Sequence, residues 1–516
     1  MKYIFFFLIF LCTNTLLSQI NKKYFLGNQL SQFTNLFVNN NSLYVSGISV
    51  SQLPNGSYGG FIGKISLEGD SLFDRSYYYY PSINNTTWWD NNVILSMKNN
   101  FLIACNMPKM ARVMKIDTLG NIIKSIDYVS CFAPQNTDLT AFNIFEDVDS
   151  IVWIISNCRA NDNLNYLQIT QFNQNLDSLK KVYIGNPNYN KWARNFSKID
   201  ANTYLIAGSY NNEGLFGNFK NIITGDFFIK VDKNCNLLSE YYVPASKKLG
   251  GMGDMVYEEK DSSYIMFGSD CYEITVDIFG YLYYYPMVYK LNKNYQMVWQ
   301  TKMGNGRYDG GNTSINIRKS IENDGYVFSG ELYDTFKVNR LDTYGTFGKV
   351  SLNGDSLWLR QYRLYEDTSR YVSGKINVIQ PSHDGGYYLS GSSIGGPKLE
   401  DQYQGGWLLK VDKFGCLVPG CEQPSSLPVL EHSKIHYQFY PNPAQDLLNV
   451  FLESTQSKQI LVKFCDSFGI PLKIIQHTGT ETTYILPVSN YVSGTYYLEF
   501  WEENKLLKSE KVILIK

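Results

Sequence analysis

Short runs of alternating apolar and polar residues make up most of the chain, and Gly, Asn, Asp and Pro separate one run from the next. In the stretch GWLLKVD, the alternation puts Trp407, Leu409 and Val411 on one face of a strand and Leu408 and Lys410 on the other. Period-two alternation bounded by turn residues is typical of β-strands. The 41 Tyr, 30 Phe and 40 Gly fit this pattern, because aromatic residues favour strands and Gly favours tight turns. We therefore expect an all-β protein.

A unit of four strands repeats along residues 20–421. It consists of a first strand, a turn rich in Asp, Asn and Gly, a second strand that ends in Gly, a loop, a third strand, a turn and a fourth strand. The length and strand content of this unit suit a four-stranded propeller blade. The repeat therefore predicts a seven-bladed β-propeller, with a β-helix or tandem sandwiches as alternatives. One marker residue recurs in the third strand of every unit: Lys64, Lys115, Gln171, Lys230, Lys290, Lys349 and Lys410.

The two ends of the repeat region predict that the ring closes on itself. The seventh unit runs into CLVPGC without a recognisable fourth strand. Residues 22–28, near the start of the chain, resemble the fourth strand of the third unit, LKKVYIGN. We expect residues 22–28 to supply the missing strand of the seventh blade. Cys416 and Cys421 flank a Pro-Gly turn at this end of the repeats, and we expect them to form a disulfide.

Loop lengths differ between the two ends of the expected blades. The first-to-second and third-to-fourth turns are short, whereas most second-to-third loops are long, as in SYNNEGLFGNFKNIITGD. Binding residues tend to lie on loops held by a rigid scaffold, so we expect a binding site on the long-loop face. Aromatic side chains suit sugars or protein partners, although alternate rings could instead be buried at strand ends. The candidates on this face are Tyr79, Tyr80, Trp88, Trp89, Tyr283, Tyr284 and Tyr285.

Composition gives little support for catalysis or nucleic-acid binding. The 46 Lys plus Arg nearly balance the 47 Asp plus Glu, which leaves no broad basic field for phosphates. The GSSIG stretch at residues 391–395 fits the GxSxG pattern, but that motif requires a strand-to-helix turn. The cysteines lack zinc-ligand spacing, and His383 is the only His within the repeats. We predict no catalytic residue, metal or cofactor, although acids drawn from several blades could still assemble an enzyme site.

The N-terminal residues 1–19 have a lone Lys2 followed by an apolar run and then small or polar residues. This pattern predicts a secretory signal peptide, with a buried strand or retained anchor as the alternative. The run is short for a membrane span, and no later segment has eighteen uninterrupted apolar residues. We therefore expect an exported chain without a transmembrane helix after removal of the signal.

Composition changes at residues 422–434, a polar segment with two prolines that predicts a linker. After it, alternating strands separated by Gly and Pro turns predict a small antiparallel sandwich over residues 435–516. This segment resembles the type A C-terminal sorting domain of the type IX secretion system of Bacteroidetes. The residues that match its motifs, in chain order, are Tyr440, Pro441, Asn442, Pro443, Leu447, Asp466, Gly469, Gly494, Tyr496 and Lys511.

The resemblance implies an export route and two partners. The tail would lead the folded protein through the outer-membrane translocon, and a sorting peptidase would then remove it. The protein would end at the cell surface or in the medium, via the periplasm. A polar segment at residues 476–483 departs from the family pattern and leaves the middle strands of the sandwich open. A generic Ig-like appendage is the alternative.

Five short sequences of the form Asp-Ser/Thr-aliphatic look like the sites at which Bacteroidetes O-glycosylate exported proteins, although such residues also suit the polar turn that enters a strand. Their hydroxyl residues are Ser71, Thr118, Ser150, Ser178 and Ser356.

These patterns together predict a secreted or cell-surface propeller with an Ig-like sorting tail. We expect its long-loop face to bind a glycan or a protein without catalysis. A propeller enzyme that cleaves polysaccharide or peptide is the alternative from a different class. A scaffold without a discrete pocket is a third possibility.

Overall fold

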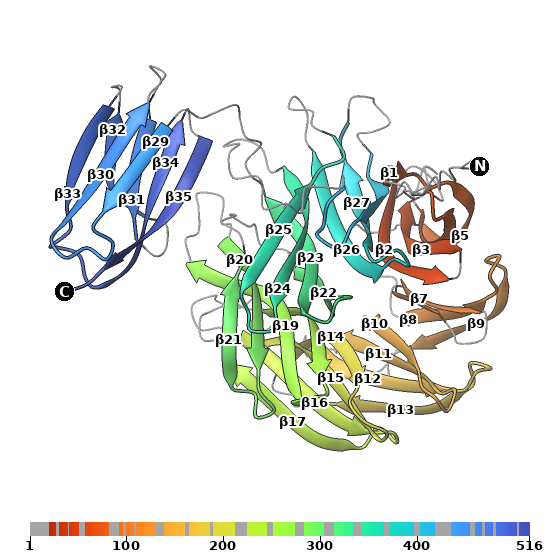
Figure 1. Cartoon of the computed structure of the whole chain (residues 1–516). Helices are drawn as coiled ribbons and strands as arrows, with labels where there is room; N and C mark the ends of the chain where they lie inside the picture. The colour runs from red at the N-terminus through yellow and green to blue at the C-terminus, as the bar shows by residue number, and fades with distance from the viewer. Residues whose placement is uncertain are drawn as a thin grey trace, which may run out of the picture. The chain divides into compact units, whose positions relative to one another are not determined.

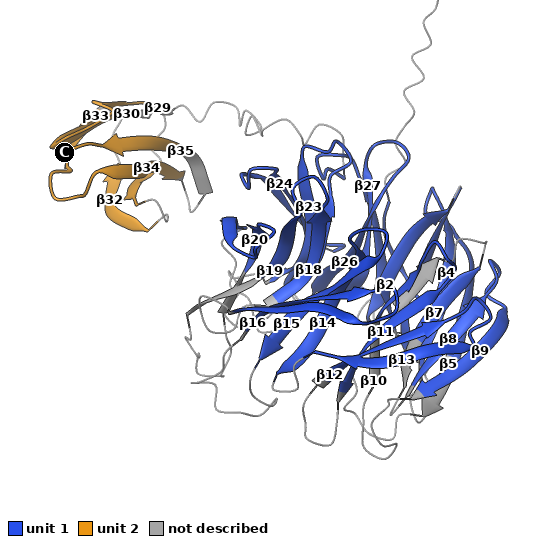
Figure 2. Ribbon diagram, turned by 90° about the horizontal axis from the view of Figure 1, so that it is seen from below, with its two compact units in different colours: residues 1–420 blue, residues 421–516 orange. Residues whose placement is uncertain are grey.

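The structure is a computed structural model of the chain. It describes residues 20–26, 30–39, 41–50, 57–81, 92–95, 100–107, 110–129, 139–159, 165–185, 189–211, 224–244, 251–273, 283–303, 314–333, 342–365, 372–396, 403–417, 435–454, 460–466, 470–477, 481–502 and 505–516. The chain divides into two compact units, residues 1–420 and 421–516 (Figure 2). The described residues contain no helix that is long and apolar enough to cross a membrane.

Seven four-stranded antiparallel sheets form the first unit and follow one another around a ring (Figure 1). Blade 1 contains β2 (Leu30–Asn39), β3 (Ser42–Val50), β4 (Ser57–Ser66) and β5 (Ser71–Pro81). Blade 2 contains β6 (Asn92–Leu95), β7 (Phe101–Met107), β8 (Met110–Ile116) and β9 (Ile122–Val129). Blade 3 contains β10 (Leu139–Glu146), β11 (Val152–Arg159), β12 (Asn165–Phe172) and β13 (Ser178–Ile184). Blades 4 and 5 contain β14 (Asn190–Lys198), β15 (Thr203–Asn211), β16 (Thr224–Asp232) and β17 (Leu237–Pro244); and β18 (Gly251–Glu258), β19 (Ser263–Glu273), β20 (Tyr283–Leu291) and β21 (Met297–Lys302). Blade 6 contains β22 (Ser314–Lys319), β23 (Gly325–Tyr333), β24 (Thr343–Ser351) and β25 (Ser356–Tyr362), and blade 7 contains β26 (Ser373–Pro381), β27 (Tyr387–Ile394), β28 (Gly405–Val411) and β1 (Asn21–Tyr24). The all-β, seven-bladed prediction is confirmed.

Strand β1 closes the ring, as the sequence predicts. It pairs antiparallel with β28, with Asn21 opposite Leu409 and Tyr24 opposite Gly406. The Lys410 backbone N–H also donates to the Ile20 carbonyl at 2.8 Å. The strand is shorter than the expected residues 22–28. It begins one residue earlier and ends at Tyr24.

A β-bulge recurs in the first strand of every blade except blade 2 within the described residues. A Gly inside the second strand lies opposite this bulge, as where Gly47 pairs with Phe33 and Gly391 pairs with Ile376. In blade 3 Ser156 takes this position. A Cβ at Gly391 would lie 1.8 Å from the Lys375 carbonyl oxygen, so a side chain does not fit there. The recurring Gly therefore accommodates the bulged inner strand.

The third-to-fourth turns share one geometry in all seven blades. The fourth turn residue donates its backbone N–H to the first, as Gly120 does to Asp117 at 3.0 Å, and it has a positive φ. Glycine occupies this position in four blades and a larger residue in three. The seven residues are Gly69, Gly120, Leu176, Cys235, Tyr295, Gly354 and Gly415.

The preceding blade contacts this turn position in two different ways. Where it is Gly, a hydroxyl from the fourth strand of the preceding blade donates to its carbonyl: Tyr24 to Gly69 (2.6 Å), Tyr77 to Gly120 (2.5 Å), Tyr362 to Gly415 (2.6 Å) and Thr301 to Gly354. Where it is larger, its side chain fills the space instead. For example, Tyr295 stacks on Tyr241 with ring centroids 4.5 Å apart. Both arrangements fasten neighbouring blades.

We expect Tyr362→Phe to lower the free energy of unfolding by about 1–2 kcal/mol, because it removes a buried hydrogen bond that joins blades 6 and 7. Urea unfolding followed by tryptophan fluorescence measures the change. Tyr403→Phe, at an exposed ring, is the matched control and should change stability by less than about 0.5 kcal/mol. Equal effects of the two substitutions would contradict the role given to the hydrogen bond.

The marker residue of the third strand is structural. Lys115 donates to the Gln174 carbonyl of the next blade at 3.2 Å, and Gln171 donates to the Lys233 carbonyl at 2.9 Å. In blade 7, Lys410 instead pairs with Asp384 of its own blade, at 2.5 Å. Similar in-blade ion pairs occur at Lys290 and Lys349. In these five blades the marker therefore either bridges two blades or pairs with an acid of the first-to-second turn. The ammonium groups of Lys64 and Lys230 instead lie over the rings of Tyr44 and Tyr295.

The second unit is a sandwich of two sheets. One has the order β29 (Ile435–Tyr440), β30 (Leu447–Ser454) and β33 (Glu481–Pro487). The other has the order β32 (Pro471–His477), β31 (Ile460–Cys465), β34 (Gly494–Glu502) and β35 (Lys505–Leu514). The two inner faces form one core, which includes the buried side chains of Leu448, Val462, Leu498 and Val512.

Candidate functional sites

The Pro-Asn-Pro segment of the sandwich is fastened to the last strand, β35. The Asn442 side chain donates to the Lys511 carbonyl at 2.9 Å and accepts the Ile513 N–H at 2.8 Å. Two residues later, the Ala444 backbone exchanges hydrogen bonds with Ile513 and Ile515. The Asn442 amide thus continues the pairing of a parallel strand along the edge of β35. This explains why an Asn stands between the two prolines.

The other predicted motif residues fall into two groups. Some serve the fold: Asp466 accepts the Ile470 N–H in a turn, Tyr496 donates to the Val492 carbonyl, and Gly494 and Lys511 lie in the β34–β35 pair. Others face solvent: Tyr440 and Leu447 are 53% and 48% exposed. Gly469 lies outside the described residues.

The candidate residues of the long-loop face are only partly described. Tyr79 and Tyr80 lie in β5, and Tyr283, Tyr284 and Tyr285 begin β20, but the description does not extend to their side chains. Trp88 and Trp89 lie outside the described residues. Chain direction places the ends of β5 and the start of β20 at the same end of their blades, where the second-to-third loops connect.

An aromatic cluster that sequence analysis missed lies at this long-loop end of blade 4. The rings of Tyr189, Tyr210 and Tyr242 lie 4.6 to 4.9 Å from one another, between centroids. The ammonium group of the buried Lys191 donates to the Tyr189 carbonyl at 2.8 Å. Burial lowers the pKa of Lys191 to about 8, and the charge of Glu240 opposes this shift. Tyr189 and Tyr242 are half-buried, so part of each ring is accessible.

A buried acid, Asp226, lies in β16 between blades 4 and 5. Its carboxylate accepts the Met252 N–H at 3.0 Å and the Tyr289 hydroxyl at 2.6 Å. Burial raises the pKa of Asp226 to about 6, although both hydrogen bonds oppose the shift. The repeats contained a signal for this residue. Four positions before each marker, the other six units have only Gly or an apolar residue: Gly60, Ala111, Leu167, Pro286, Gly345 and Gly406.

The raised pKa of Asp226 predicts a pH-dependent stability. Native Asp226 keeps its proton up to about pH 6, whereas an Asp in the unfolded chain loses it near the ordinary Asp pKa of 3.8. The contribution of Asp226 to the free energy of unfolding therefore falls as the pH rises from about 4 to 6. The fall is about 3 kcal/mol, because each unit of pKa difference corresponds to about 1.36 kcal/mol.

Asp226→Asn should consequently stabilise the protein by about 1–3 kcal/mol at pH 7.5 and change little at pH 4. The amide can accept the Met252 N–H and donate to the Tyr289 oxygen, so no buried partner is lost. Urea unfolding at the two pH values tests this, with the exposed Asp149→Asn as control. A loss of stability in Asp226→Asn at pH 7.5 would show that the ionised form is the favoured one.

A polar belt links the inner strands of blades 4, 5 and 6. Asp254 accepts the side-chain amides of Asn195 and Asn316, each at 2.8 Å. It also accepts the backbone N–H groups of Met255 and Ile317, at 2.8 and 3.1 Å. Burial raises the pKa of Asp254 even though these hydrogen bonds and Arg318 favour the charged form. The described residues contain no group of three or more His, Cys, Asp or Glu placed to hold a metal.

The GSSIG serine is not in a nucleophile elbow. Ser393, the residue at the nucleophile position, lies within β27 and is 1% exposed. Cys416 is disulfide-bonded, and Cys421, its expected partner, lies outside the described residues. Cys158, Cys235 and Cys465 are free and buried.

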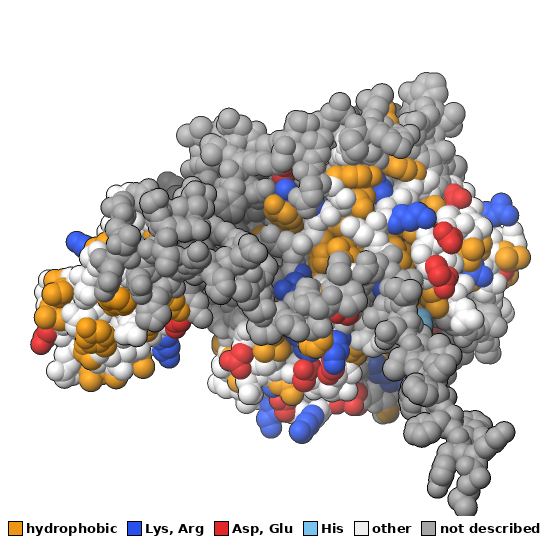
Figure 3. Space-filling view, turned by 45° about the horizontal axis from the view of Figure 1, so that its top comes forward, with side chains coloured by type: hydrophobic (Ala, Val, Ile, Leu, Met, Phe, Trp, Pro, Cys, Tyr) orange, Lys and Arg blue, Asp and Glu red, His pale blue; other side chains and the backbone are white. Residues whose placement is uncertain are grey.

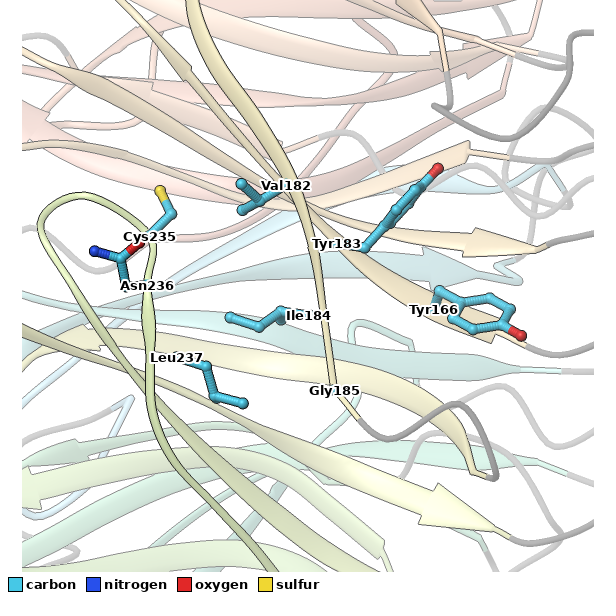
Figure 4. Close-up of a pocket in the computed structure, with 8 residues that line it drawn as sticks. All are labelled: Tyr166, Val182, Tyr183, Ile184, Gly185, Cys235, Asn236 and Leu237. Carbon is cyan, nitrogen blue, oxygen red and sulfur yellow. The ribbon is translucent and has the colours of Figure 1, made fainter.

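A groove of about 530 Å³ runs between β13 and the turn that leads into β17. In Figure 4, Val182 and Ile184 point from β13 toward this turn, and Tyr183 points to the other side of the strand. Cys235 lines the opposite wall, and burial raises the pKa of its thiol to about 12. The groove lies between the outer strands of two blades, and its wall is mainly apolar.

Figure 3 shows acidic and basic side chains interspersed on the visible side of the propeller. This mixed surface agrees with the balanced composition. The five Asp-Ser/Thr-aliphatic sequences differ in accessibility: Ser71, Ser178 and Ser356 begin the fourth strands of three blades and are exposed, whereas Thr118 and Ser150 are half-buried.

Comparison with known proteins identifies the C-terminal segment. Residues 438–516 match the family described as "Secretion system C-terminal sorting domain". This tail marks the chain as an exported protein of the type IX secretion route, destined for the cell surface or the medium. No curated protein matches the chain.

Several solved structures resemble the chain at a distance. They include the hydrazine synthase of Kuenenia stuttgartiensis (8% identity, TM-score 0.37, 57% of this chain and 73% of that one). A puromycin hydrolase gives 6% identity and a TM-score of 0.44, with 82% of this chain and 58% of that one covered. An α-L-arabinofuranosidase of Fusarium graminearum gives 7% identity and a TM-score of 0.37, with 62% of this chain and 92% of that one covered.

Proposed function

We propose that the exported propeller is a non-catalytic binding module that takes a glycan or a protein on its long-loop face. The observation that carries the proposal is the aromatic cluster of Tyr189, Tyr210 and Tyr242 at the long-loop end of blade 4. Rigid rings with polar tips provide contact area at little entropic cost. The candidate residues Tyr283 to Tyr285 would extend this aromatic surface over the neighbouring blade 5. Tyr79 and Tyr80 of blade 1, with Trp88 and Trp89 after them in the chain, would add aromatic rings farther around the same face.

The opposite face offers less for a ligand. Its third-to-fourth turns are tight in every blade, and their backbone groups are already bonded within the turn and, in four blades, to the preceding blade. The two buried acids described above, Asp226 and Asp254, lie in different blades, and each is already hydrogen-bonded. A pair of acids poised for hydrolysis would need free oxygen atoms directed at a substrate.

A glycan array and a pull-down of secreted proteins, both with the chain lacking residues 1–19, test the proposal. The variant changes Tyr283, Tyr284 and Tyr285 to Ala, and Leu352→Ala, at an exposed side chain of a third-to-fourth turn on the opposite face, is the control. Saturable binding that the triple variant loses and the control keeps supports the long-loop site. Binding retained by the triple variant moves the site elsewhere, and no binding at all would refute the module and direct the search to hydrolase activity.

We further propose that the exposed hydroxyls of Ser71, Ser178 and Ser356 carry O-linked glycans in the exported protein. Mass spectrometry of peptides from the secreted chain should find added hexose mass on these three sites and little on Thr118 and Ser150, which are half-buried. Unmodified peptides at all three exposed sites would leave the sequences as ordinary strand-entry turns.

A further inference from the structure

We propose that the groove between blades 3 and 4 binds a small, uncharged phenol, whose ring takes the place that a Tyr or Trp ring of the protein occupies at the other blade junctions. Val182 and Ile184 of β13 form one wall of this groove, and Cys235 lines the other (Figure 4). The groove shares no lining residue with the tyrosine surface of the long-loop face.

Neighbouring blades meet at an equivalent junction around the whole ring. There the fourth strand of one blade contacts the positive-φ turn residue of the next blade. The contacting strand position lies opposite the residue four before the marker, as Tyr77 lies opposite Gly60. In chain order, the residues at this position are Tyr24, Tyr77, Tyr128, Ile184, Val243, Met303 and Tyr362.

An aromatic ring occupies six of these seven junctions. Either the fourth strand or the turn supplies it. At the junction of blades 2 and 3, Tyr128 packs with the turn residue Leu176 in one buried cluster. At the junction of blades 5 and 6, a Cβ on Gly354 would lie 2.6 Å from the Trp299 ring. The six rings are those of Tyr24, Tyr77, Tyr128, Tyr295, Trp299 and Tyr362.

The junction of blades 3 and 4 is the exception. Its strand position is Ile184, its turn residue is Cys235, and Val182 precedes Ile184 by two residues on β13. None of these three side chains has a ring. They are the residues that line the groove of about 530 Å³. The groove therefore lies where the other junctions contain a ring of the protein.

The walls of the groove favour an uncharged ligand. No residue that lines it is acidic or basic, and burial keeps the Cys235 thiol protonated by raising its pKa to about 12. The nearby Lys180 already donates its ammonium to the Asn234 carbonyl. A charged ligand would lose its hydration here without gaining an oppositely charged partner in the walls.

The turn carbonyl favours a phenol over a plain aromatic ring. The hydroxyls of Tyr24, Tyr77 and Tyr362 each donate to the turn carbonyl of the next blade, at 2.5 to 2.6 Å. At the junction of blades 3 and 4 the equivalent carbonyl is that of Cys235, and it accepts no hydrogen bond from any residue that the structure describes. A phenol in the groove can donate to it in the same way.

Size favours a free small molecule. The volume of the groove is within the range of about 300–1,000 Å³ that small-molecule sites have, and both walls come from this chain. A protein that inserted one tyrosine here would also need several hundred Å² of matching surface around the groove. We therefore assign a free phenol, and the experiment includes tyrosine within a peptide as the alternative.

An NMR titration of the exported protein with p-cresol, the tyrosine side chain as a free molecule, tests the proposal. We expect a Kd of about 1 mM, which is typical of so small a ligand. 4-Methylanisole has no hydroxyl to donate and should bind about fivefold more weakly, because one hydrogen bond is lost. N-acetyl-tyrosinamide, which adds peptide groups to the ring, should bind no more tightly than p-cresol.

Variants place the binding in the groove. Leu237→Ala removes a half-exposed side chain from its wall and should raise the Kd of p-cresol at least about threefold. Leu238→Ala removes the next side chain, which is equally exposed but does not line the groove, so it is the matched control. Ile184→Tyr adds the missing ring to the protein and should abolish binding. Thermal unfolding checks that each variant folds, and the leucine pair decides alone if Ile184→Tyr does not.

Several results would overturn the proposal. They are no binding to the wild type at about tenfold the expected Kd, binding that a folded Ile184→Tyr variant keeps, and equal effects of the two leucine variants. Equal affinity for 4-methylanisole and p-cresol would overturn the choice of a phenol. Binding of N-acetyl-tyrosinamide more than about tenfold tighter than p-cresol would assign the groove to a tyrosine of a protein partner and overturn the assignment to a free phenol.

Discussion

Removal of residues 20–26 is expected to lower the free energy of unfolding of the propeller by roughly 5–8 kcal/mol. The deletion takes away Ile20, Tyr24 and Leu26, which are almost fully buried, and burial of one such side chain contributes about 1.5–3 kcal/mol. It also exposes the edge of β28, whose hydrogen bonds to β1 are lost. A loss of this size is comparable to the whole stability of many domains, about 5–15 kcal/mol.

Urea unfolding and limited proteolysis of the truncated chain measure this effect. A synthetic peptide of residues 20–28, added to the truncated protein, should restore part of the protection, because it can refill the vacant edge. The matched control is the Lys22→Ser variant, since this side chain is half exposed and its ion pair with Asp70 at 3.8 Å lies at the surface. Unchanged stability of the truncated chain would show that three strands suffice for the seventh blade.

The number of blades and the closure of the ring could be predicted because both depend on local signals. Each third strand carries its own marker, and residues 22–28 resemble another fourth strand closely enough to be recognised. The turns could also be predicted from the sequence, because Gly-rich or Asn-rich stretches mark them. What sequence alone could not give is the pairing between blades, because the partners are about 60 residues apart. The hydrogen bond from Asn316 to Asp254, for example, joins residues 62 apart.

The candidate site was also predictable only in part, because some of its features follow from local sequence and others from contacts between distant residues. Loop lengths indicated which face to consider, but the ring contacts of Tyr189, Tyr210 and Tyr242 come from three different strands or connections and have no common sequence pattern. Asp226 could have been found by aligning the repeats, since an acid there interrupts a column of Gly and apolar residues. The sorting tail was recognisable from its motifs, whereas the separation of its residues into buried and exposed ones needed the strand register.

Asp254→Asn and Asp226→Asn, the two isosteric changes of buried acids, are expected to change the free energy of unfolding in opposite directions. The larger change is expected for Asp254→Asn. Every group around this carboxylate is a donor: two side-chain amides and two backbone N–H groups. In Asp254→Asn, one oxygen becomes an NH₂ that faces other N–H groups, so at least one buried donor loses its acceptor. At about 1–3 kcal/mol for each unsatisfied buried group, we expect a loss of about 2–4 kcal/mol, where Asp226→Asn gains stability.

A double-mutant cycle with Asn316 gives this prediction its control. Asn316→Asp alone places a second carboxylate beside Asp254 and should also destabilise the protein. In the double variant of Asn316→Asp and Asp254→Asn, the side-chain amide at position 254 can donate to the carboxylate at position 316. The Ile379 N–H and the Arg318 guanidinium still find an oxygen at position 316, as they do in the wild type. The double variant should therefore be more stable than the sum of the two single losses by about 1–2 kcal/mol in urea unfolding at pH 7. Strict additivity, or an Asp254→Asn variant as stable as the wild type, would mean that the belt does not hold blades 4, 5 and 6 together through these hydrogen bonds.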